Sequence, residues 1–123
     1  MANILLWLYL TNAILLINHE IDSAYWNEWK LFNLPGDIKG FLISHFPLLF
    51  LVLYGLVLIS QQAPAGLIFS LFLSLGGIFA FIIHMYFIKK GKKEFKTPVS
   101  LFILISTLIV STIQLIYTII LLV

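Results

Sequence analysis

Long apolar runs separated by short polar segments dominate the chain. Four runs stand out, at about 3–28, 38–60, 66–88 and 99–123. Each reaches or approaches the ~20 residues that a helix needs to cross ~30 Å of hydrocarbon at 1.5 Å per residue. Because the connections are short, neighbouring helices should run antiparallel. The pattern predicts an all-α protein, an integral membrane four-helix up-down bundle.

The connecting segments carry the residues expected at turns and helix ends. Pro35-Gly36 favours a tight turn, and Asp37 follows as a candidate cap of the second helix. The segment QQAPA interrupts the chain at 61–65, and Thr97-Pro98 has the N-cap and N1 residues of a fourth helix.

Composition supports this class. Of 123 residues, 62% are hydrophobic and 10% are charged, whereas soluble domains are about one quarter charged. The length fits a single domain, 1–123, with the lipid bilayer as its main partner. The chain has no cysteine, which excludes disulfides and thiolate ligands. It also lacks arginine, and we expect no nucleic-acid partner.

The lysines predict an orientation. Five of the seven lie in the stretch 89–98 (Lys89, Lys90, Lys92, Lys93 and Lys96), which should therefore be cytoplasmic. Both termini and QQAPA are then external. Tyr25, Trp26 and Trp29 should mark the cytoplasmic boundary of the first span, because amphipathic rings collect at the membrane interface.

Helical spacing predicts which side chains face the inside of the bundle. Small or polar residues recur on one face of the third and fourth spans, and shorter sets occur on the first and second. The sets are Gly66, Ser70, Ser74, Gly77 and His84; Ser100, Thr107, Ser111, Gln114 and Thr118; Asn12, His19 and either Asp22 or Ser23; and Ser44 with His45.

All three histidines fall in the cytoplasmic half of three different spans, and Glu20 and Asp22 share that layer. Ionisable groups at this depth are costly unless they are paired, and they are usually functional. We therefore predict a site there, with His19, His45 and His84 as metal ligands. Three imidazoles and a carboxylate suit a divalent metal, with zinc first and iron, nickel or copper acceptable.

Helical angles select the carboxylate. Residues i and i+3 lie about 60° apart on a helix, whereas i and i+2 lie about 160° apart. Asp22 can therefore join His19 as the fourth ligand or as its hydrogen-bond partner. Glu20 needs another role, as a general base or as the partner of Lys30 or Lys39. Glu20 and Asp22 are thus the candidate catalytic residues, although HEIDS lacks the second histidine of the HExxH motif.

The stretch from His19 to Leu49 resembles a family of small bacterial four-span membrane proteins of unknown function. The matching positions are His19, Glu20, Ile21, Asp22, Tyr25, Trp26, Leu34, Pro35, Gly36 and His45. The resemblance implies the four-span fold and a multi-pass location in the bacterial inner membrane. The chain is similar in outline to the small multidrug-resistance transporters, which also have four spans and a glutamate in the first.

Three functions remain open, and the sequence does not decide whether the protein is an enzyme. The first is a metal-dependent reaction on a lipid or amphipathic substrate, with Glu20 or Asp22 moving the proton. The second is a proton- or metal-coupled transporter, as a homodimer. The third is a non-catalytic accessory or sensor subunit. A metal-free hydrogen-bonded cluster or proton relay is the alternative to the metal site.

Overall fold

The computed structural model of the protein describes residues 2–91 and 96–123. Lys92 and Lys93, two of the lysines used to predict the orientation, lie outside these ranges. Four of the helices are long and apolar enough to cross a membrane, which confirms the predicted all-α membrane bundle. The elements are α1 (Ala2–Tyr25), α2 (Glu28–Leu31), α3 (Asp37–Ser60), α4 (Ala65–Lys89) and α5 (Pro98–Leu122).

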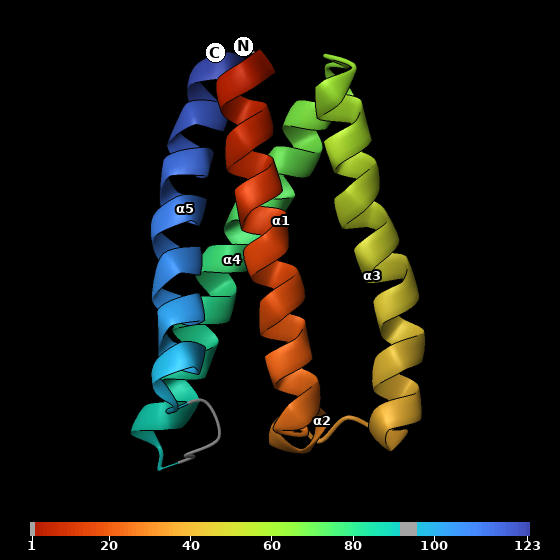
Figure 1. The fold of residues 1–123 in the computed structure, drawn as a ribbon, viewed down its shortest axis with the longest axis vertical. Helices are drawn as coiled ribbons and strands as arrows, with labels where there is room; N and C mark the ends of the chain where they lie inside the picture. The colour runs from red at the N-terminus through yellow and green to blue at the C-terminus, as the bar shows by residue number, and fades with distance from the viewer. Residues whose placement is uncertain (1, 92–95) are drawn as a thin grey trace.

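The long helices alternate in direction, as the short connections require (Figure 1). Both termini and the α3–α4 connection lie at one end of the bundle, and α2 lies at the other. Helix α4 crosses the bundle obliquely, so that it begins next to α3 and ends next to α5 (Figure 1). Helix α3 lies on the side of α1 opposite α5 (Figure 1), and the space between α1, α3 and α4 contains a cavity.

The predicted inner faces of α4 and α5 are confirmed. Every small or polar residue assigned to them is buried. Their side chains form a network between helices: Asn12 Nδ2 donates to Ser111 Oγ at 3.0 Å and to Gln114 Oε1 at 2.9 Å, and Gln114 Nε2 donates to Ser70 Oγ at 2.9 Å. Hydrogen bonds of this kind stabilise helix contacts where the surroundings offer no water.

Close packing of α4 on α5 depends on Gly77. A Cβ atom built at Gly77 would lie 3.0 Å from Ser111 Cβ and 3.1 Å from Thr107 Cγ2. Both distances are shorter than ordinary contacts between carbon atoms. The small-residue face of α4 therefore acts as predicted, by letting two helix backbones approach each other.

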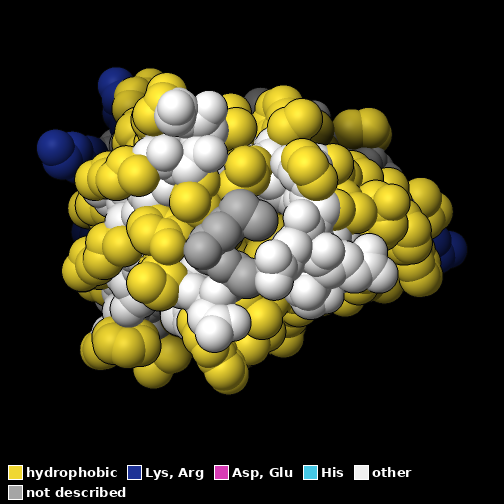
Figure 2. Space-filling model, turned by 90° about the horizontal axis from the view of Figure 1, so that it is seen from above, with side chains coloured by type: hydrophobic (Ala, Val, Ile, Leu, Met, Phe, Trp, Pro, Cys, Tyr) yellow, Lys and Arg dark blue, Asp and Glu magenta, His cyan; other side chains and the backbone are white. Residues whose placement is uncertain are grey.

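The outer surface is hydrophobic. Figure 2, which looks down on the end that holds the termini, shows mainly hydrophobic side chains. Large apolar residues are strongly exposed along the helices, among them Phe46, Phe72 and Phe102. An exposed apolar surface of this extent belongs in lipid.

The start of α5 matches the prediction, whereas the start of α3 differs from it. Thr97 Oγ1 accepts a hydrogen bond from Ser100 N at 3.1 Å, with Pro98 as the first helical residue. At α3 the N-cap is Gly36, and no side chain caps the helix. Asp37 is instead the first helical residue. Its carboxylate can still favour the positive helix end through charge.

The predicted inward position of Ser44 is wrong, because this residue is exposed. Its hydroxyl donates to the carbonyl of Phe41 within its own helix, at 2.9 Å. Such a bond satisfies the hydroxyl without a partner on another helix.

The first helix ends earlier than predicted. It stops at Tyr25, and Asn27 has a left-handed backbone conformation with φ 56°. That conformation breaks the helix and reverses the chain into α2. Trp29, predicted as an interfacial anchor, is buried instead and packs on the ring of Phe41, with a centroid distance of 5.7 Å. The turn therefore folds the segment after Tyr25 under the bundle.

Candidate metal centre

His19, Glu28 and His84 form one group at the α2 end of the bundle. One potential ligand atom from each lies within 4.8 Å of the others. His84 Nε2 lies 3.0 Å from Glu28 Oε1, and the two imidazole rings meet edge to face with centroids 4.5 Å apart. The histidines are only 3% and 2% exposed. Two imidazoles and a carboxylate at this spacing match the size of a metal coordination sphere.

Three separate elements bring these side chains together. His19 lies on the inner face of α1, and the helix ends nearly two turns later at Tyr25. The left-handed Asn27 then turns the chain back, so that Glu28 begins α2 below the end of α4. His84 belongs to the buried face of α4. The site therefore depends on the turn at residues 26–27.

The hydrogen bonding of His84 constrains what lies between it and Glu28. Nδ1 of His84 lies 2.7 Å from the carbonyl oxygen of Ala80. A carbonyl oxygen can only accept, so Nδ1 carries a proton. In the neutral ring, Nε2 would then turn a lone pair toward the Glu28 carboxylate, which is also an acceptor. The 3.0 Å contact therefore requires either a proton between the two groups or a cation shared by both.

Glu28 is held in its charged form. Burial alone would raise the pKa of its carboxyl group. The hydrogen bond with His84 and the charges of His84 and His19 outweigh burial, and they place the pKa of Glu28 below its ordinary value. A carboxylate that is ionised and mostly shielded from solvent is a strong ligand for a cation.

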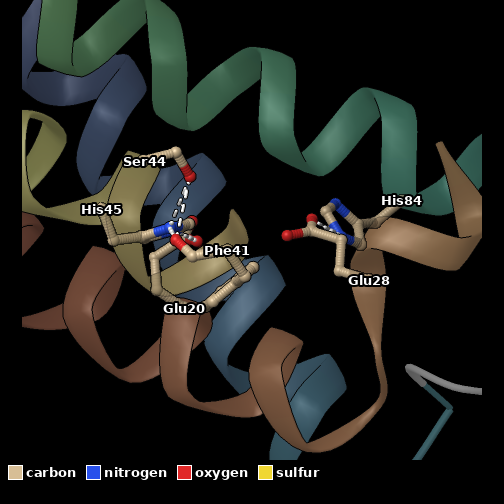
Figure 3. Close-up of polar contacts among 6 residues, drawn as sticks. All are labelled: Glu20, Glu28, Phe41, Ser44, His45 and His84. Carbon is tan, nitrogen blue, oxygen red and sulfur yellow. Dashed lines mark hydrogen bonds and ion pairs between the residues drawn. The ribbon is translucent and has the colours of Figure 1, made fainter. Parts of the chain in front are cut away.

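A second imidazole–carboxylate pair, Glu20 with His45, joins α1 to α3. Glu20 Oε2 contacts His45 Nε2, and His45 Nδ1 lies 2.6 Å from the carbonyl oxygen of Phe41. The His45 ring also stacks on Phe41, with centroids 3.9 Å apart. In Figure 3 the two pairs lie on opposite sides of the same space, and the Glu28 carboxylate points toward Glu20 and His45.

One cavity of about 600 Å³ includes Glu20 and all three members of the first group in its lining. These four residues form one end of it. Most of the remaining wall comes from α1, α3 and α4, with Phe32 after α2 and Thr107 of α5 completing it. It is mostly apolar, including Leu16, Leu48, Leu51, Phe69, Phe72 and Phe79. The cavity therefore combines a long apolar chamber with a charged end.

The structure brings together only part of the predicted ligand set. His19 and His84 lie together. His45 pairs with Glu20, and Asp22 Oδ1 accepts a hydrogen bond from Trp26 Nε1 at 3.1 Å. Glu20 therefore has a histidine as its partner, in place of Lys30 or Lys39.

Glu28 is the residue that sequence reasoning missed. Helical angles relate two side chains only inside one continuous helix, and α1 ends between His19 and Glu28. The available signal was its position among the acidic residues of the segment NHEIDSAYWNEW (18–29).

Comparison with known proteins gives a family but no described activity. No curated protein matches the chain, and no solved structure matches it. One family model matches residues 5–121, described as a family of unknown function (DUF6713). Because the match covers nearly the whole chain, this four-span protein belongs to the family of unknown function DUF6713.

Proposed function

We propose that the protein binds one divalent metal ion, with zinc as the first candidate, between His19, Glu28 and His84. Two imidazole nitrogens and one carboxylate oxygen are the protein ligands of several catalytic zinc sites, in which the fourth position stays open. All three side chains have the right chemistry, and their ligand atoms lie within 4.8 Å of one another. Compared with the sequence-based set, Glu28 takes the place of His45 and Asp22.

The contact between His84 and Glu28 is the observation that carries the proposal. Nδ1 of His84 is committed to Ala80, while Nε2 lies 3.0 Å from Glu28 Oε1. A histidine whose second nitrogen is fixed by a carbonyl is the usual form of a metal ligand, because that bond orients the ring and sets its tautomer. A divalent cation bound to both His84 Nε2 and the Glu28 carboxylate would remove the repulsion between these two hydrogen-bond acceptors.

The neighbouring pair provides a route for a proton. A divalent ion bound at the site would supply Lewis acidity. Glu20 lines the same cavity and contacts His45, so it can accept a proton from the cavity and share it with that imidazole. We propose a metal-dependent reaction on a lipid or amphipathic substrate, with Glu20 as the general base.

Metal content tests the binding proposal. Wild-type protein purified gently without chelator should contain about one metal ion per chain by elemental analysis. Glu28→Gln, which keeps the shape and removes the charge, should contain far less. Asp37→Asn is the matched control, because it makes the same change outside the group, and it should keep the metal. Metal-free wild-type protein would end the proposal.

A second candidate function is proton-coupled transport. It is favoured by the two imidazole–carboxylate pairs that meet around one cavity, since such pairs form proton relays in membrane proteins. Transport by this route predicts a proton flux in proteoliposomes that is lost in Glu20→Gln. Stoichiometric metal together with an unchanged flux in that variant would favour the metal site.

We also propose that the protein lies in the bacterial inner membrane with the α4–α5 connection in the cytoplasm. The excess of lysine in that segment supports this orientation. Because the native chain has no cysteine, a cysteine introduced by substitution is the only thiol that the reagent can label. Gln61→Cys should react with an impermeant thiol reagent in intact cells, whereas Lys90→Cys should react only after permeabilisation. The reverse pattern would show the opposite orientation.

A further inference from the structure

We propose that the cavity between α1, α3 and α4 binds a single-chain amphiphile with a carboxylate head, that is, a long-chain fatty acid. Its head would lie at His19, Glu28 and His84, and its chain would extend along α4. The inference rests on the proposed metal site for the head group. It names the class of molecule on which that site acts.

The shape of the cavity fits one extended chain. Its lining runs along α4 from Phe69 to His84, which is roughly 22 Å at 1.5 Å per residue. Spread over that length, about 600 Å³ gives a mean cross-section of roughly 25–30 Å². Carbon atoms in contact lie ~4 Å apart, so one methylene chain needs roughly 20 Å². The cavity therefore has room for one hydrocarbon chain and not for two.

The chamber faces the bilayer, so its occupant can enter sideways from the lipid. Leu51 of α3 and Phe72 and Phe79 of α4 line the cavity and are 51%, 70% and 64% exposed, so the cavity wall continues into the apolar outer surface of the bundle. An apolar chamber of this kind is poorly suited to water, because water needs polar partners. A lipid chain fits the apolar lining of the cavity and can reach the cavity directly from the bilayer.

The charged end favours a carboxylate over a phosphate. Three protein ligands would leave an open position on a bound divalent ion, which an anionic oxygen of the head group can occupy. Glu20 and Glu28 both line this end. A doubly charged phosphate would meet these two carboxylates, whereas a fatty acid brings a single negative charge and less repulsion. A neutral alcohol would bring no charge for the cation.

Gly76 offers a way to close the chamber without disturbing the metal site. It lines the cavity, and a Cβ atom built on it meets nothing within 4 Å. It lies about midway between Phe69 and His84 along α4. Gly76→Phe should therefore fill the chamber with its ring. Leu75→Phe is the matched control, because Leu75 is the adjacent residue, is exposed and does not line the cavity.

The experiment measures binding of radiolabelled stearate to zinc-loaded protein in nanodiscs, with zinc content determined on the same samples. Wild type and Leu75→Phe should bind about one stearate per chain. Gly76→Phe should bind at least tenfold more weakly while keeping its zinc. Stearyl alcohol and stearyl phosphate should compete at least tenfold less well than stearate against the wild type.

Equal binding by wild type and folded Gly76→Phe would overturn the inference, as would equal competition by the alcohol or the phosphate. The competition arm uses wild-type protein only, so it decides the question even if Gly76→Phe does not fold. Zinc-loaded protein that fails to bind stearate would contradict the inference and leave the metal site standing. Protein that holds no zinc would contradict both the fatty-acid inference and the proposed metal site. The zinc content measured on the same samples distinguishes these two outcomes.

Discussion

His84 Nε2 lies 3.0 Å from Glu28 Oε1, which joins the end of α4 to the four-residue helix α2. Because His84 Nδ1 already bonds the Ala80 carbonyl, the contact needs a proton or a cation between its two partners. This pair is the structural basis of the proposed metal site.

The first prediction concerns zinc affinity. Glu28→Gln removes the anionic ligand, and changes to groups that only orient a ligand already cost about 10–100-fold in affinity. We expect a loss of roughly 100-fold or more, measured by competition with a chromophoric chelator at fixed pH. His45→Ala should stay within about threefold of wild type, because His45 lies with Glu20. A large loss in His45→Ala with none in Glu28→Gln would favour the ligand set predicted from sequence.

The second prediction concerns Glu20 and His45 as a contact between α1 and α3. Glu20→Gln and His45→Gln should each destabilise the protein, and the double variant should lose less than the sum of the two. Contacting residues typically couple by about 0.5–3 kcal/mol, and unfolding in detergent measures the coupling. The same cycle with Glu20→Gln and Asn18→Gln is the control, since Asn18 is exposed and bonds within its own helix. Additive effects at Glu20 and His45 would show that the two groups do not interact.

The third prediction concerns the hydrogen bonds of Asn12 to α5. Asn12→Leu removes the donor that serves both Ser111 and Gln114. Single interhelical bonds in membranes are worth about 0.6 kcal/mol and at most about 1.7. We expect a loss of roughly 1–2 kcal/mol in the free energy of unfolding. Asn18→Leu, which makes the same change at an exposed position, should alter it by less than about 0.5 kcal/mol; equal losses would contradict the network.

The fourth prediction compares two adjacent glycines on α4. Gly77→Ala places a methyl group against Ser111 and Thr107, so α4 and α5 must separate, at a cost of about 1–3 kcal/mol. Gly76→Ala meets nothing within 4 Å and should be neutral or slightly stabilising, because alanine favours a helix over glycine by about 0.5–1 kcal/mol. Thermal unfolding of both variants in the same detergent tests this order. A less stable Gly76→Ala would contradict it.

Much of the fold could be predicted from the sequence, because it depends on two local features, namely the length of the apolar runs and the spacing of residues along each helix. Apolar runs of sufficient length predict membrane helices, and spacing on a helix predicts which residues share a face. The burial of Ser70, Ser111 and Gln114 follows from that spacing. The pairing of His19 with His84 was also within reach, since both lie on inner faces at one depth.

The rest of the site depends on geometry that spacing does not contain. Glu28 reaches His84 only because Asn27 adopts a left-handed conformation and ends the first helix. His45 of α3 contacts Glu20 of α1, and the angle of a residue on its own helix does not say which neighbouring helix it meets. The cavity between α1, α3 and α4 likewise depends on how these helices are tilted against one another. A tilt between helices is a property of the whole packing and not of any single segment.

The ligands of a bound metal test the central claim most directly. Zinc K-edge X-ray absorption of protein loaded with one equivalent of zinc counts the scattering groups around the ion. We predict two imidazole nitrogens at ~2.0–2.1 Å and a carboxylate oxygen at ~2.0–2.2 Å, with the imidazole signal unchanged in His45→Ala and halved in His84→Ala. A shell of light oxygen scatterers without imidazole, or an imidazole signal lost in His45→Ala, would contradict a site formed by His19, Glu28 and His84.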